Sequence, residues 1–159
     1  MATIIPSENH YYAMNYTSVD FIEGVPATYF LFSLREQGER HFNNFDTADA
    51  ELHVEGLSTP FWVHKDYLIL QSPFFREIFR EASQSSDDSL IVINIPSPET
   101  FAPLLEYLYT GNDEKWYDTM DRNNYYDVWL NVDFLGLGKE ARAICFAYYQ
   151  NEILESEET

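Results

Sequence analysis

The stretch FWVHKDYLILQSPFFREIFREA, residues 61–82, carries the clearest structural signal in this chain of 159 residues. It opens with a short aromatic, β-prone segment and continues into two apolar turns of helical character. Ser72 and Pro73 mark a helix start, because serine caps helices well and proline suits the first helical position. The apolar residues that follow share one helix face, at i, i+3, i+4 and i+7: Phe75, Ile78, Phe79 and Ala82. The stretch therefore predicts a strand that leads directly into a pair of helices.

The residues on either side of this stretch predict two more strands. In ADAELHVEG, residues 48–56, apolar side chains occupy every second position, which is the period of a half-buried strand. The turn EGLSTP then makes residues 61–64 the returning strand of a hairpin. The run LIVINI, residues 90–95, is continuously apolar and of strand length, so we expect a strand buried on both faces.

Helical signals dominate the rest of the chain. SPETFAPLLEYLYTG, residues 97–111, repeats the serine–proline start and ends at a glycine. The segment 112–122 is polar and is expected to be a loop, and two further helices are predicted in 124–138 and from Lys139 to about Leu154. A small sheet followed by a run of helices is an α+β arrangement. The helix stripes predict a buried core: Phe75, Ile78, Phe79, Leu104, Leu105, Leu108, Trp129 and Val132.

The two ends of the chain differ from its middle. Residues 1–44 are expected to form an N-terminal arm, and within it TYFLFSL, residues 28–34, is β-prone and predicts an extra strand. Residues 35–47 are a polar connection, and residues 155–159 form a short acidic tail.

Charge and composition exclude several classes of function. The formal net charge of −18 disfavours nucleic acid and anionic membrane surfaces as partners, because both are bound through cationic side chains. The single cysteine, Cys145, allows no disulfide within the chain and is expected to be an inert core thiol. No signal peptide and no apolar run of membrane-spanning length is present, so we expect a cytoplasmic or nuclear location.

The order and spacing of these motifs resemble a BTB/POZ domain. The resemblance is carried by DAELHVEG, FWVHKDYLILQSPFFREIF, LIVINIPSPETFAPLLEYLYTG and NYYDVWLNVDFLGL, and it implies a domain over residues 45–154. It implies a three-stranded sheet with a cluster of five to six helices, together with the β-prone arm. The sequence departs from strand-swapping members of the family, because FSLREQGERHFNNF is a poor match to the amphipathic helix that precedes their first strand.

No motif for catalysis or for a cofactor is present. The four histidines form no pair with metal-ligand spacing, and the phosphate-binding glycine motifs are missing. A Cys145–His64 nucleophile pair has no local signature to support it. We therefore expect no catalytic residues, no metal and no cofactor, and an enzyme ranks far below an interaction module.

His64 and Lys65 lie where the strand meets the helix, and two interpretations remain open. In the first, His64 bonds neighbouring backbone and Lys65 is solvated. In the second, which the resemblance implies, Asp49 and Lys65 lie with His64 in a charged pocket near a dimer interface, as in the transcription-factor branch of the family.

The resemblance also implies a surface that binds a cullin scaffold. Adaptors of this type usually carry a hydrophobic–x–Glu tripeptide after the third helix, whereas residues 83–85 here are polar. Phe79-Arg80-Glu81 matches the hydrophobic–x–Glu motif, although Phe79 is expected in the core. The candidate cullin-facing residues are Phe74, Phe79, Ser83, Ser85, Tyr109 and Trp116, together with the loop 111–124.

The sequence thus predicts a protein–protein interaction module that forms a homodimer and recruits a partner. One role that the resemblance implies for this module is that of a substrate adaptor of a cullin-RING ubiquitin ligase. The alternative is a dimerising transcriptional regulator or scaffold that does not bind a cullin.

Overall fold

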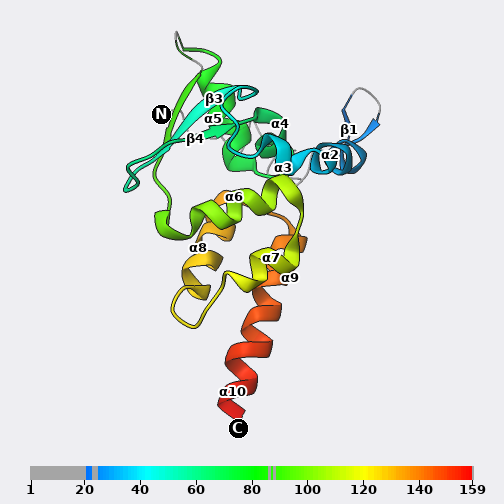
Figure 1. Ribbon diagram of the computed structural model, residues 1–159, viewed down its shortest axis with the longest axis vertical. Helices are drawn as coiled ribbons and strands as arrows, with labels where there is room; N and C mark the ends of the chain where they lie inside the picture. The colour runs from blue at the N-terminus through cyan, green and yellow to red at the C-terminus, as the bar shows by residue number, and fades with distance from the viewer. Residues whose placement is uncertain (1–20, 23–24, 86, 88, 159) are drawn as a thin grey trace, which may run out of the picture.

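The computed structural model describes residues 21–22, 25–85, 87 and 89–158 (Figure 1). A small sheet lies at one end of the molecule, helices occupy the middle, and the C-terminal helix extends away at the opposite end. A two-stranded hairpin and the helix after it protrude to one side. This arrangement agrees with the predicted α+β class and with the predicted three-stranded sheet.

The sheet consists of strands β3 (Ala50–Val54), β4 (Phe61–Val63) and β5 (Leu90–Ile93), in the order β4-β3-β5. The predicted hairpin is confirmed, since β3 and β4 pair antiparallel. β5 runs parallel to β3, and parallel neighbours require a crossover connection. Helices α4 (Lys65–Ile69) and α5 (Pro73–Ala82) provide that crossover, and they are the helix pair expected from residues 61–82.

The predicted start of α5 is confirmed in detail. The Ser72 hydroxyl oxygen accepts the Phe75 backbone N–H at 3.2 Å, and Pro73 occupies the first turn. The same hydroxyl donates to the carbonyl of Leu135 at 2.6 Å. Leu135 is the last residue of α8 (Tyr125–Leu135), so one buried serine caps α5 and joins it to a distant helix.

Helix α6 (Phe101–Thr110) follows a short 3-10 turn, η1 (Pro98–Thr100), and ends at Gly111 in the left-handed conformation. Ser97 does not cap this turn through its side chain. Instead, its backbone N–H donates to the Asn131 side chain at 2.9 Å, and the Asn131 amide donates back to its carbonyl at 2.7 Å. Because Asn131 is fully buried, this exchange fixes the entry of α6 against α8.

Seven of the eight predicted core residues are buried, and Trp129 is the exception. Trp129 is only partly buried, because it lies at the margin of α8 where its ring packs on the core along one side. The Arg142 guanidinium lies over that ring, 5.3 Å from its centroid. The prediction of a buried Trp129 is therefore corrected to a partly buried side chain covered by an arginine.

Residues 28–34 are helical, which contradicts the predicted extra strand. They lie within α2 (Ala27–Glu36), which follows the short hairpin of β1 (Phe21–Ile22) and β2 (Val25–Pro26). The aromatic composition that favoured a strand has only a weak intrinsic preference, and tertiary context overrides it. Helix α3 (Gly38–His41) comes next and packs on α6, so a helical pair precedes the first strand of the sheet.

The segment 112–122 also differs from its prediction as a loop. It contains helix α7 (Asp113–Asp118), which begins where the Asn112 side chain accepts the Lys115 backbone N–H. Trp116 of this helix stacks on Tyr107 with ring centroids 4.4 Å apart. The apolar residues Trp116 and Met120 thus close a side of the core.

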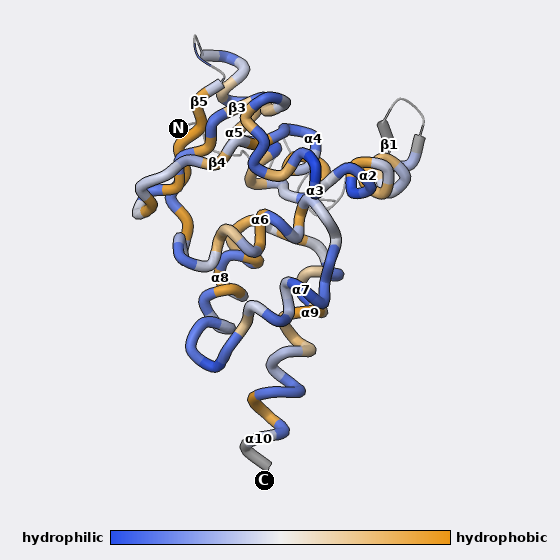
Figure 2. Tube along the Cα trace, in the orientation of Figure 1, coloured by the Kyte–Doolittle hydropathy of each residue, from blue (hydrophilic) through white to orange (hydrophobic). Residues whose placement is uncertain are grey.

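β5 differs from the expected strand buried on both faces. Its residues alternate, with Ile91 and Ile93 buried while Leu90 and Val92 are 45% and 56% exposed. A continuous apolar run does not specify where a strand lies in its sheet, and here it forms the edge. Figure 2 shows this apolar strand at the sheet end of the molecule.

The chain ends in a nearly continuous helical segment. Helix α9 (Lys139–Tyr148) passes into a π-helical stretch, η2 (Tyr149–Leu154), and then into α10 (Glu155–Glu158), which includes most of the predicted acidic tail. Cys145 is buried in α9, as expected, and burial raises the pKa of its thiol to about 12. Among the described residues, no helix is both long and apolar enough to cross a bilayer.

Candidate interaction surfaces

His64 is the buried centre of a hydrogen-bonded cluster that reaches the surface at Thr47. Its backbone N–H donates to the Tyr109 hydroxyl at 2.7 Å, and its ring Nδ1 lies 2.8 Å from the same hydroxyl. Its Nε2 lies 2.7 Å from Thr47 Oγ1, which in turn lies 3.1 Å from His41 Nδ1. This cluster joins the end of β4 to α6 and to the connection before β3, so His64 acts as a structural lock.

A neutral imidazole satisfies every atom of this cluster. The Tyr109 hydroxyl donates to Nδ1, Nε2–H donates to Thr47, and the Thr47 hydroxyl donates to His41. Burial, reinforced by His41 and partly offset by Asp49, lowers the pKa of His64 below its ordinary 6.5. Burial likewise raises the pKa of Tyr109. Both groups are therefore held in their uncharged forms at neutral pH.

The structure brings Asp49, His64 and Lys65 close together, but not as an ion pair. An Asp49 carboxylate oxygen accepts the Lys65 backbone N–H at 2.8 Å, which satisfies a donor in the first turn of α4. Asp49 thus contacts the backbone of Lys65 rather than its ammonium group. The His64 ring bonds two side-chain hydroxyl groups rather than the neighbouring backbone that the first interpretation expected. The acid of the second interpretation lies beside the junction, and its place near a dimer interface stays a prediction.

Helix α2 presents an exposed aromatic surface within the N-terminal arm. Tyr29 and Phe32 are 65% and 67% exposed, and Ala27 is the buried residue of the helix. Large aromatic side chains at this exposure are unusual for a helix that packs on a core along a full stripe. One feature of the sequence indicated a helix here: Ala27, Leu31 and Arg35 are spaced by four residues, and they line the inner side of α2.

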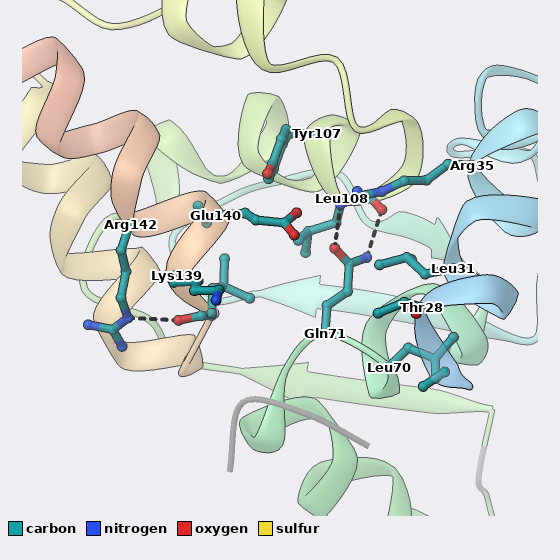
Figure 3. Close-up of a pocket in the computed structure, with 14 residues that line it drawn as sticks. Thr28, Leu31, Arg35, Leu70, Gln71, Tyr107, Leu108, Lys139, Glu140 and Arg142 are labelled. Carbon is teal, nitrogen blue, oxygen red and sulfur yellow. Dashed lines mark hydrogen bonds between the residues drawn. The ribbon is translucent and has the colours of Figure 1, made fainter. Parts of the chain in front are cut away.

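The C-terminal end of α2 is fixed to the domain. Arg35 donates to the Gln71 side-chain oxygen at 2.7 Å, and the Gln71 amide donates to the carbonyl of Leu108, also at 2.7 Å (Figure 3). The Tyr67 hydroxyl donates to the carbonyl of Leu34 at 2.5 Å. These bonds connect α2 to α4 and α6, so the helix projects its aromatic side chains from a rigid base.

A cavity of about 590 Å³ lies between α2, α6 and the start of α9. Figure 3 shows Arg35 and Gln71 pointing toward one another on one side, with Lys139, Glu140 and Arg142 across from them. Arg35, Lys139 and Arg142 are three of the nine basic residues in the whole chain. Arg142 is already occupied, since it bonds the Leu137 carbonyl and the Asp133 carboxylate.

The predicted cullin-facing residues divide into two groups. Ser83 and Ser85 are exposed, and Phe74 is half-buried against Phe134 with ring centroids 4.9 Å apart. The other three are corrected, because the structure buries them: Phe79, Tyr109 and Trp116. Each belongs to the apolar side of its helix, so Tyr109 and Trp116 form the core instead, and Phe79 is buried as its helix stripe predicted.

Helix α8 supplies exposed apolar residues that were not predicted for this surface. Tyr126, Leu130 and Phe134 follow at i, i+4 and i+8 and so share one helix face. Tyr126 and Phe134 are among the exposed large hydrophobic residues, and Phe134 contacts Phe74. We refer to Phe74, Tyr126, Leu130 and Phe134 as the α8 strip. The four-residue spacing of these apolar residues was visible in the sequence. It lies directly beside the stripe containing Trp129, which was predicted as the buried face of this helix.

Whether these surfaces could also carry out chemistry depends on metal-ligating and nucleophilic side chains. Among the described residues, no group of three His, Cys, Asp or Glu side chains is placed to hold a metal ion. The raised pKa of Cys145 keeps its sulfur protonated, which does not suit a nucleophile. What the described residues offer are exposed aromatic and apolar faces on a rigid frame.

Comparison with known proteins agrees with this description. The family model for the BTB/POZ domain matches residues 39–135. Human Kelch-like protein 34 is 26% identical over 106 residues, which are 67% of this chain but 15% of the length of that relative. The BTB domain of zebrafish PATZ1 superposes with a TM-score of 0.53 at 18% identity, covering 95% of this chain and 100% of that domain, which shows a common fold.

Proposed function

This chain belongs to the BTB/POZ domain family, and we propose that it is a self-associating protein-interaction module whose subunits meet through helix α2. BTB/POZ domains are protein–protein interaction modules. The observation that carries the proposal is the exposure of Tyr29 and Phe32 on a helix anchored at its far end by Arg35 and Gln71.

Charge favours a second copy of α2 as the partner of this face. The chain carries a net charge of −18, so most surfaces of two copies repel one another. Residues 27–34 contain no charged side chain, and Arg35 and Glu36 at the end of the helix cancel. An aromatic, uncharged face is therefore the part of this surface that two copies can bring together at the lowest electrostatic cost.

The test is the mass of the full chain in solution, measured by light scattering at about 10 µM, where a micromolar interface is largely occupied. We expect twice the chain mass of 18.7 kDa. The double substitution Tyr29→Glu/Phe32→Glu should give the single mass at this concentration. Phe146→Glu, which changes an exposed aromatic residue on α9, is the matched control and should keep the double mass. A double mass retained by the α2 variant would refute the proposal.

A cullin scaffold is the second candidate partner, through the α8 strip and the exposed loop that contains Ser83 and Ser85. The contact between the half-buried Phe74 and the exposed Phe134 favours this candidate, because it adjoins the helix from which family adaptors bind cullin. The polar residues 83–85 lack the usual apolar side chain, which is worth about 2 kcal/mol. We therefore expect roughly thirtyfold weaker binding than for an adaptor that has it.

Calorimetric titration with a cullin N-terminal domain tests this second partner. Binding should be lost on Phe134→Glu, and it should survive deletion of residues 1–27. Absence of heat for the unmodified chain at about 100 µM would contradict it. The alternative, a dimerising transcriptional regulator or scaffold without cullin binding, would then be the better account.

A further inference from the structure

Strand β5 is an edge strand with exposed apolar side chains, a combination that folded proteins usually avoid. It lies at the edge of the sheet, and two of its four side chains, Leu90 and Val92, are large, apolar and about half exposed. Its other two side chains, Ile91 and Ile93, are buried in the core and hold the strand in place. The outward side chains are therefore displayed by a rigid element.

Among the residues that the structure describes, no strand pairs with the outer side of the β5 backbone. The Glu51 N–H donates to the Ser89 carbonyl at 2.8 Å, and the Glu55 N–H donates to the Ile93 carbonyl at 2.9 Å. Odd-numbered residues of β5 thus face β3, and in a parallel ladder the N–H and C=O groups of Leu90 and Val92 point away from it. Within the described part of the chain, β3 is the sole strand that pairs with β5.

Nothing in residues 90–95 protects this edge. Natural edge strands are usually blunted by lysine, by proline, by inward-pointing charge or by a bulge. LIVINI contains no charged residue and no proline, although the chain as a whole is strongly acidic. Such an edge is a template for another strand.

We propose that β5 pairs antiparallel with β5 of a second copy of this chain, about a two-fold axis at Ile91. Leu90 then lies opposite Val92 of the partner subunit, and Val92 lies opposite Leu90 of the partner subunit. The outward N–H and C=O groups of these residues exchange hydrogen bonds, and the two sheets join into one, in the order β4-β3-β5-β5-β3-β4.

The chain's own strand is favoured over an unrelated peptide because β5 is self-complementary. The two-fold axis creates two identical pairs of Leu90 with Val92 of the partner subunit, so apolar side chains face apolar side chains. The acidic residue Asp87 lies opposite Ile95 of the partner subunit in this register, so the acids that precede the strand do not face one another. This contact goes beyond the proposed function, since α2 and β5 are separate elements and either interface can exist without the other.

Mass at high concentration is the first test. A contact of four-residue strands is small, so we expect it at several hundred micromolar rather than at 10 µM. At that concentration the mass of the unmodified chain should exceed the mass of the α2 dimer. The Tyr29→Glu/Phe32→Glu chain should form a dimer through β5. Adding Val92→Lys to that chain should return it to 18.7 kDa, whereas adding Phe146→Lys should not. An unchanged mass with Val92→Lys would overturn the proposal.

Cross-linking tests the register independently of any change in charge. The Cα atoms of a hydrogen-bonded antiparallel pair lie about 5.5 Å apart, within the range that a disulfide spans. A mixture of Leu90→Cys and Val92→Cys chains should therefore form a mixed disulfide under mild oxidation, at least tenfold more than either chain alone. Cys145 is buried and should not compete. Equal yields in the mixture and in the separate chains would refute the pairing.

Discussion

Removal of the Tyr109 hydroxyl is the sharpest test of the His64 cluster. In Tyr109→Phe the ring remains, and with it the stack on Tyr67, whose centroid lies 4.1 Å away. What disappears are the contacts of the hydroxyl with the His64 backbone N–H at 2.7 Å and with Nδ1 at 2.8 Å. The substitution therefore isolates hydrogen bonding from packing.

The magnitude follows from the burial of the groups left behind. A buried backbone N–H without a partner costs about 1–3 kcal/mol, and the lost bond to the ring nitrogen adds about 0.5–1.5 kcal/mol. His64 is buried, so solvent cannot easily replace the hydroxyl. We expect the free energy of unfolding to fall by about 1.5–4.5 kcal/mol, which for a chain of this size lowers the melting temperature by roughly 3–18 °C.

Urea unfolding followed by circular dichroism measures this change. Tyr126→Phe, which removes the hydroxyl of an exposed tyrosine on α8, is the matched control and should stay within about 0.5 kcal/mol of the unmodified protein. A loss below about 0.5 kcal/mol for Tyr109→Phe would show that the cluster does not stabilise the fold, and the description of His64 as a structural lock would be wrong.

Three further outcomes are expected. Leu105→Ala should lower the free energy of unfolding by about 2–5 kcal/mol in urea titrations, because Leu105 is fully buried, and an unchanged melt would place it on the wrong face. Gly38→Ala should cost about 1–3 kcal/mol in the same assay, since its Cβ would lie 2.0 Å from the Tyr109 carbonyl oxygen. The lowered pKa of His64 means that the unfolded chain binds more protons below pH 6.5, so stability should fall as the pH drops through and below 6.5. His64→Gln should flatten this dependence, and an equal slope in the two proteins would contradict it.

The sheet and the main helices were predictable because their signals are local. Alternation at residues 50–54 and the serine–proline pair at 72–73 each depend on neighbours within a few positions. The three-stranded sheet and the helical core follow from them. The position of β5 at the sheet edge was not predictable, because an apolar run looks the same in the sequence whether the strand lies at the edge or in the middle of a sheet.

Tertiary contacts decided the elements that the sequence mispredicted. α2 is helical although its composition favours a strand, and its inner side is fixed by Arg35 and by the carbonyl of Leu34, which bond side chains from α4 and the residues after it. Trp116 lies in a polar segment, yet Tyr107 provides a ring for it to stack on. In both cases the partner is far away in sequence, so no local pattern could reveal it.

The candidate site was predicted less well than the fold. Asp49, His64 and Lys65 do lie together, because the hairpin register brings the start of β3 beside the end of β4. The aromatic residues predicted at the surface were buried ones, whereas Tyr29 and Phe32 carry the exposed face. A single sequence marks where large apolar residues occur, but exposure depends on which helix face remains uncovered.

The parallel pairing of β3 with β5 also sets an order of events during synthesis. β5 leaves the ribosome about 40 residues after β3, which at ~5–20 residues per second is a delay of about 2–8 s. The β3–β4 hairpin can form within microseconds, so it waits through this delay with one side of β3 unpaired. The nascent chain, rather than the finished domain, is thus the form most open to aggregation, and a chaperone that shields it for those seconds would raise the yield of folded protein.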